Sequence, residues 1–231
     1  MTATMIFVGA DKGGVGKTMT ARLLLDLMKV RNMKLRAFDA DYPGGDLSRF
    51  AGYASIVNID SIDDQMKVFD GVNDDAVTVV DLPAGRLMSA IQTLDDARLL
   101  EDVKRGVMKM TLLHVLGPTV RSIGEISAAA SRIGNVRHLL VKNHISPDAS
   151  YFDWDTSDTK DILASMAPMM IDIPFMEDRI RETLEKSGPE KAGESFLDFM
   201  NDPAQSRTIK GLLKTWAEKC WKEFDRVGVL A

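Results

Sequence analysis

The sequence predicts an α/β protein with a doubly wound, mostly parallel sheet and a helical C-terminal tail. Short apolar runs alternate with segments of helical periodicity from the N-terminus to about residue 173, which is the pattern of strands joined by helices. Such connections cross over in the right-handed sense and give parallel pairing. The 231 residues suit one domain. We divide it into an α/β core of residues 1–187 and a helical tail, 188–231, packed on that core.

Each element is predicted from one of two patterns, an apolar run for a strand or apolar residues at helical spacing for a helix. Buried strands are expected at apolar runs that span residues 4–10, 35–40, 77–80, 112–116, 136–141 and 169–173. Helices are expected at 18–30, 62–69 and 122–133 and after residue 178, with loops at 145–158 and 187–194. In the tail, apolar side chains at helical spacing predict a face packed on the core rather than a membrane-binding face: Ile209, Leu212, Leu213, Trp216, Cys220 and Phe224.

The composition excludes several classes of protein. A net charge of -5 argues against a strongly basic nucleic-acid binder. The single cysteine, Cys220, excludes a disulfide framework and a cysteine-only metal cluster within one chain. Three histidines lack the short paired spacing of zinc ligands and are expected to be structural: His114, His138 and His144. No apolar run is long enough to span a membrane, and no basic segment precedes the first one, so we expect a cytoplasmic protein.

A glycine-rich loop lies between the first predicted strand and the first predicted helix, where the sequence reads ADKGGVGKT. Gly13, Gly14 and Gly16 permit a close backbone approach, and their N–H groups can point at phosphate oxygens. Lys17 would reach the outer phosphates, and the Thr18 hydroxyl would bind Mg²⁺. The alternative is a glycine-rich turn with chance lysines. The strand–loop–helix context favours phosphate binding.

This loop resembles the deviant Walker A motif of the ParA/MinD group of P-loop ATPases. The usual first glycine is replaced by Asp11, and a signature lysine, Lys12, precedes the glycine pair. The resemblance covers about residues 1–180. It implies a P-loop NTPase fold, ATP and Mg²⁺ as ligands, and an ATP-dependent homodimer in which Lys12 reaches the partner's phosphates. The nucleotide contacts that it implies in this loop are Gly13, Gly14, Val15, Gly16, Lys17, Thr18 and Met19.

Acidic residues close two of the predicted strands. Asp39 and Asp41 resemble the D-x-D of the family. The resemblance implies that the second aspartate, Asp41, positions the attacking water, so Asp41 joins Lys12 and Lys17 as a catalytic candidate. Tyr42 intervenes where the family usually continues with proline. A solvated acidic turn is the alternative.

The strand that ends in Asp81 resembles Walker B, whose carboxylate holds Mg²⁺ through water. The expected metal set is therefore Thr18, Asp39 and Asp81, unless Asp81 merely ends a strand in a turn. Pro83 and Gly85 after it suit a switch loop that senses the γ-phosphate.

Two later residues resemble the segments that lie beside the nucleotide base in this family. Asn143 ends one predicted strand and Pro174 closes the last. An asparagine amide both donates and accepts and can read adenine. Asparagine is also a common turn residue, so both roles stay open.

Within the family, the sequence fits a short ParA-like partition or positioning ATPase best. The loop begins at the eleventh residue, so we expect no DNA-binding domain before it. We expect slow ATP hydrolysis, stimulated by a ParB-like adaptor, that positions a plasmid, a chromosome or another cargo. Two alternatives remain: an ATP-dependent small-molecule ligase or synthetase of the same fold, and a scaffold that binds nucleotide without turnover.

The tail is more basic than the rest of the chain. Residues 205–231 carry six basic and three acidic side chains. Lys210, Lys214 and Lys222 recur at helical spacing and predict weak, sequence-independent DNA binding that strengthens in an ATP-bound dimer. A solvated outer face of a packed helix is the alternative. No stable membrane insertion is expected.

Overall fold

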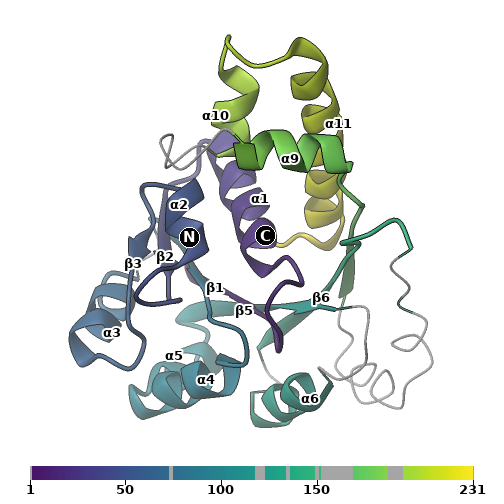
Figure 1. Ribbon diagram of the computed structural model, residues 1–231. Coiled ribbons are helices and arrows are strands. Elements are labelled where there is room, and N and C mark those ends of the chain that lie inside the picture. The colour runs from purple at the N-terminus through teal and green to yellow at the C-terminus, as the bar shows by residue number, and fades with distance from the viewer. Residues whose placement is uncertain are drawn as a thin grey trace.

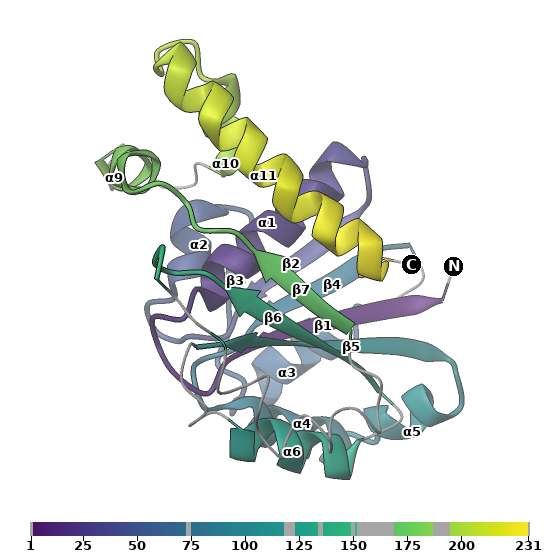
Figure 2. The same cartoon turned by 90° about the vertical axis from the view of Figure 1, so that its right-hand side faces the viewer.

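A computed structural model describes residues 2–72, 75–117, 123–133, 136–148, 151, 169–186 and 195–230. In this part of the chain a single sheet has the strands β1 (Ala3–Gly9), β2 (Leu35–Asp39), β3 (Ser55–Ile56), β4 (Val77–Asp81), β5 (Met108–Leu116), β6 (Arg137–Asn143) and β7 (Met169–Ile173). Their order is β3-β2-β4-β1-β5-β6-β7, and every pair is parallel (Figure 1; Figure 2 labels all seven strands). The carboxyl ends of the strands therefore meet along one edge of the sheet.

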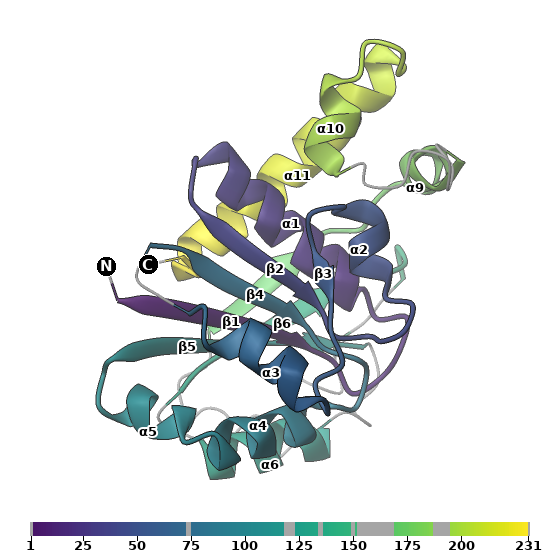
Figure 3. The same cartoon turned by 90° about the vertical axis from the view of Figure 1, so that its left-hand side faces the viewer.

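Helices cover both faces of this sheet. They are α1 (Lys17–Val30), α2 (Asp46–Phe50), α3 (Ile62–Phe69), α4 (Leu87–Asp96), α5 (Leu99–Lys104), α6 (Ile123–Arg132), α9 (Asp178–Lys186), α10 (Phe196–Asn201) and α11 (Arg207–Val227). Because side chains alternate along a strand, Ile6 and Val8 of β1 pack with α1, α10 and α11. Met5 and Phe7 pack with α3, α4, α5 and α6 on the opposite face (Figure 3).

The tail helix α11 lies along β7 and α1 (Figure 2). Its buried side chains include Leu213, Trp216, Cys220 and Phe224. The indole N–H of Trp221 also donates a 3.0 Å hydrogen bond to the Leu23 carbonyl of α1. Burial raises the pKa of the Cys220 thiol, so this cysteine is a packing residue.

The structure confirms the predicted fold class and extends it. All six predicted strands are present, and the sheet is parallel throughout the described strands. The strand expected at 112–116 begins earlier, at Met108. Its first residues were missed because the exposed Lys109 interrupts the apolar pattern on which the prediction depends. Several elements were not predicted from the sequence, namely β3, α2, α4 and α5. The predicted loops fall wholly (187–194) or largely (145–158) outside the described residues.

One residue of the tail is placed differently from the prediction. Leu212 is 49% exposed, although its spacing assigned it to the packed face. It precedes the buried Leu213 by one residue, which turns it about 100° around the helix and past the edge of that face. None of the described helices is long and apolar enough to cross a membrane.

Candidate nucleotide-binding site

The glycine loop joins β1 to α1 at the carboxyl edge of the sheet. Gly14 and Gly16 have φ values of 78° and 90°, the left-handed region that favours glycine. Gly16 is also required by packing, because an added Cβ would lie 1.8 Å from Nδ2 of Asn143. That same Nδ2 donates a 2.8 Å hydrogen bond to the Val15 carbonyl. The end of β6 therefore fixes the shape of the loop.

The other glycines of the loop face open space. A Cβ added at Gly13 or Gly14 would meet no atom within 4 Å, and Gly13 is not in the left-handed region. The protein's own packing thus explains Gly16 but gives no reason for glycine at position 13. A ligand that closely approaches the backbone would explain this glycine, because a side chain at position 13 would block the approach. The loop therefore fits a phosphate group, which backbone N–H groups bind.

The first turn of α1 is bonded to the end of β4. The Lys17 ammonium donates a 2.7 Å hydrogen bond to Oδ1 of Asp81, and the Thr18 hydroxyl donates one of 2.9 Å to Oδ2. The side chains of Lys17 and Asp81 are only 10% and 1% exposed. Burial raises the pKa of Asp81 to about 6, against the opposing effect of Lys17.

Asp39 lies beside Asp81 in the register of β2 and β4. It is fully buried, and its two oxygens accept hydrogen bonds from the backbone N–H groups of Asp41 (3.1 Å) and Ser48 (2.9 Å). An added Cβ at Gly45 would lie 2.0 Å from its Oδ1. Asp39 therefore organises the loop between β2 and α2, and its predicted contact with a metal stays a proposal.

Lys12 and Asp41 lie apart from this bonded group. Both residues are exposed, and neither side chain takes part in the hydrogen bonds or ion pairs found among the described residues. Tyr42, the residue that departs from the family pattern, is 59% exposed next to Asp41. The structure thus brings together Lys17, Thr18 and Asp81 and leaves the other two catalytic candidates at the surface.

The two residues predicted beside the base are both tied to the protein. Asn143 is 3% exposed and holds the glycine loop through its amide. The Pro174 carbonyl accepts a 2.8 Å hydrogen bond from the indole N–H of Trp216. In this structure Asn143 shapes the loop, and reading of adenine by either residue stays a proposal.

Comparison with known proteins bears on this fold. No family model and no curated protein matches the chain. The cell division ATPase MinD of Pyrococcus furiosus matches with a TM-score of 0.50 and 17% identity, over 95% of this chain and 99% of that one. A chain of the MinC:MinD cell division protein complex of Aquifex aeolicus matches with 0.52 and 18%, over 92% and 95%. A proposed plasmid partition protein of Borrelia burgdorferi B31, bound to AMPPNP, matches with 0.53 and 15%, over 97% and 99%.

The chain has the fold of the MinD and plasmid-partition ATPases. The resemblance seen in the glycine loop is thus confirmed at the level of the fold.

In this MinD/ParA-type fold, two further contacts hold the loop that follows β4. The backbone N–H of Gly85 donates a 2.8 Å hydrogen bond to the Ala10 carbonyl, which joins this loop to the glycine loop. Oε1 of Glu125 accepts a 3.0 Å hydrogen bond from Leu87 N at the start of α4. Burial raises the pKa of Glu125. Glu125 had no sequence signal, because only the fold brings α6 to α4.

The described residues contain no group of three or more His, Cys, Asp or Glu side chains suited to a metal. A magnesium ion bound here would depend on the predicted set of Thr18, Asp39 and Asp81 together with phosphate oxygens and water, which suits its chemistry. His114 and His138 instead hydrogen-bond each other at 2.9 Å in the interior. Burial lowers the pKa of His114 to about 3, so this pair is neutral and structural.

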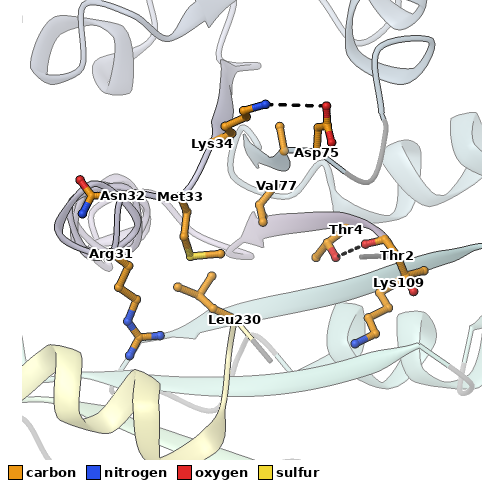
Figure 4. Close-up of a pocket in the computed structure, with 11 residues that line it drawn as sticks. Thr2, Thr4, Arg31, Asn32, Met33, Lys34, Asp75, Val77, Lys109 and Leu230 are labelled. Atoms are coloured by element: carbon orange, nitrogen blue, oxygen red, sulfur yellow. Dashed lines mark hydrogen bonds and ion pairs between the residues drawn. The ribbon is translucent and has the colours of Figure 1, made fainter.

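A cavity of about 700 Å³ lies at the opposite edge of the sheet. Figure 4 shows its basic residues Arg31, Lys34 and Lys109, with Lys34 paired to Asp75 at 3.7 Å. The cavity opens at the amino ends of the strands, away from the glycine loop. It plays no part in the candidate site.

Proposed function

We propose that the chain binds ATP with Mg²⁺ at the glycine loop, hydrolyses it slowly, and dimerises while ATP is bound in order to position a cellular cargo. The observation that carries this proposal is the group formed by Lys17, Thr18 and Asp81 at the mouth of a loop whose remaining glycines face open space. Cation, hydroxyl and carboxylate are the groups that a metal–triphosphate needs. The MinD/ParA-type fold agrees with it.

In this proposal each residue has a separate task. Lys17 exchanges Asp81 for the outer phosphates and neutralises their charge. Thr18 and Asp81, with Asp39 beside Asp81, would hold Mg²⁺, which would withdraw charge from the phosphate oxygens. Asp41 positions the attacking water. Lys12, exposed on the loop, reaches the phosphates of a second copy of the chain.

The three lysines of the predicted DNA-binding face differ in their surroundings on α11. The Lys210 ammonium donates a 2.9 Å hydrogen bond to the Asp202 carbonyl, so this lysine is committed to the chain. Lys214 and Lys222 remain exposed. The three lysines do not form one free face, because Lys210 lies at the edge of the packed side of α11. Binding of DNA or of a ParB-like adaptor is therefore left as the outcome of an experiment.

Phosphate release tests the proposed function. Purified protein should hydrolyse ATP slowly, and turnover should rise with duplex DNA or with an adaptor. Lys17→Ala should abolish the turnover, whereas Lys34→Ala, a lysine at the opposite edge of the sheet, should leave it unchanged. Turnover that requires a small acid as co-substrate would instead indicate a ligase. Nucleotide binding without turnover would indicate a scaffold.

A further inference from the structure

Arg22 is a buried cation in contact with two aromatic rings. It lies one turn after Thr18 on the same side of α1 and is 9% exposed. Its guanidinium carbon is 3.8 Å from the ring centroid of Phe50 and 4.0 Å from that of Phe196. Both rings are thus in cation–π contact with the guanidinium, whose N–H donors point outward in its own plane. Burial lowers the pKa of Arg22 to about 10, so it remains charged near neutral pH.

The N–H groups of Arg22 find no acceptor in the described chain. Its Nε is buried without a hydrogen-bond partner, and no hydrogen bond or ion pair of the described residues includes its guanidinium. Asp26, one turn further along α1, attracts Arg22 electrostatically, but no hydrogen bond or ion pair of the described residues joins the two. Its Oδ2 accepts a 3.3 Å hydrogen bond from Leu197 N, and its Oδ1 is buried without a partner. A buried guanidinium without acceptors is costly. An anion bound beside Arg22 would accept these hydrogen bonds and remove this cost.

Arg22 lines a cavity of about 190 Å³ between α1, α2 and α9. The apolar part of its wall is formed by Phe50, Met176, Leu184 and Phe196. Thr18 forms the side nearest the glycine loop. The volume corresponds to about six water molecules, which suits a small organic group and is too little for a whole nucleotide.

The other charged groups of the wall are already paired or lie in solvent. Arg181 is paired with Asp178, and Asp46 with Arg49 at 3.1 Å. Glu185 is exposed at the wall. Among the described residues that line this cavity, Arg22 is therefore the buried charged one that forms no ion pair, although Asp26 behind it attracts it electrostatically.

We propose that this cavity binds a small carboxylic acid, whose carboxylate takes the edge of the Arg22 guanidinium while its apolar part lies against Phe50, Phe196 and Leu184. A planar carboxylate matches the paired donors of a guanidinium better than any other common anion of this size. The apolar wall favours an organic acid over inorganic phosphate. Because Thr18 belongs both to this cavity and to the glycine loop, the bound acid would contact the helix that carries the nucleotide site. The proposal does not rest on the proposed ATPase function.

The test follows the side-chain Nε–Hε signal of Arg22 by NMR in the nucleotide-free protein, with the signal assigned from Arg22→Met. Propionate and succinate are titrated to tens of millimolar at constant ionic strength, with propionamide as the neutral control of the same shape. A parallel thermal melt records stabilisation by each compound. Arg181→Met, which removes a guanidinium from the same wall but one already paired, is the matched control.

The expected result is a saturable shift and a raised melting temperature with an acid but not with propionamide, lost in Arg22→Met and kept in Arg181→Met. Arg22→Met should fold, because methionine keeps a flexible, unbranched apolar side chain against the two rings. Arg22→Lys keeps the charge without the paired donors and should bind the acid about tenfold more weakly. The proposal is overturned if no acid saturates the signal, if propionamide or phosphate binds as well as propionate, or if Arg22→Met still binds. Full displacement of the acid by ADP would also overturn it, since the cavity would then be part of the nucleotide site.

Discussion

The ammonium of Lys17 donates a 2.7 Å hydrogen bond to the carboxylate of Asp81 in the interior. The first of these residues is the proposed phosphate ligand, and the second is a proposed ligand of Mg²⁺. Each therefore neutralises the other in this structure. In the proposed function, a bound metal–nucleotide replaces this ion pair: Lys17 then pairs with phosphate and Asp81 with the metal. The Lys17–Asp81 contact is therefore the one that we expect to break when the nucleotide binds.

Lys17→Ala should abolish binding of ATP–Mg²⁺, measured by titration calorimetry, because the phosphates lose their cation. The variant should also unfold more easily, by about 3 kcal/mol, since a buried carboxylate is left without its partner. Lys34→Ala is the control, because both side chains of its ion pair are 75% exposed, and it should change stability by less than about 0.5 kcal/mol. Near-normal affinity for ATP–Mg²⁺ in Lys17→Ala would refute the assignment of the loop.

Two glycine substitutions should separate folding from binding. Gly16→Ala should destabilise the protein, because its Cβ would lie 1.8 Å from Asn143 Nδ2 and its φ is 90°. Gly13→Ala should fold normally, since its Cβ meets no atom within 4 Å, but it should lose affinity for nucleotide. Melting temperatures and nucleotide titrations of both variants check this. If Gly13→Ala binds as wild type does, the open side of the loop is not the phosphate site.

The sequence predicted the parts of this site that follow from local pattern. The glycine loop, the acidic strand ends and the alternation of strands and helices are all encoded within short windows, so their positions could be read directly. The sequence could not show which distant residue each of these side chains contacts. Asn143 and Val15, or Arg22 and Phe196, are brought together by the packing of distant elements. Short elements such as β3 and α2 also carry too few residues for a periodic pattern.

Asp41→Ala should bind ATP as wild type does but hydrolyse it at least about tenfold more slowly, because positioning of the attacking water affects the transition state rather than the ground state. Its exposed carboxylate makes no hydrogen bond with the described chain, and its backbone N–H holds Asp39. Stability should therefore stay unchanged. Single-turnover hydrolysis measures the effect. Wild-type turnover would move this role to another residue.

Asp26 should make the protein less stable as the pH rises from about 4 to about 6. Burial raises its pKa from 3.8 to about 6, although Lys29, Arg22 and the N-terminus of α10 oppose the shift. In this window the folded protein binds more protons than the unfolded chain, so the free energy of unfolding falls with rising pH and stays lower above it.

Asp26→Asn removes this titration and keeps an acceptor for Leu197 N. The variant should be more stable than wild type at pH 7.5, by up to about 3 kcal/mol, and the difference should vanish near pH 4. Urea unfolding at several pH values measures it. Asp81 titrates in the same window but is present in both proteins, so the difference reports Asp26. An equal pH dependence in the two proteins would contradict the prediction.

Sedimentation velocity with AMPPNP and with ADP tests the proposed switch most directly. Wild type should form a dimer with AMPPNP–Mg²⁺ and a monomer with ADP. Lys12→Ala should bind AMPPNP but remain a monomer, because its exposed ammonium is the group proposed to reach the partner's phosphates, whereas Lys34→Ala should dimerise as wild type does. A wild-type protein that binds AMPPNP and stays monomeric, or a Lys12→Ala variant that still dimerises, would contradict the proposal.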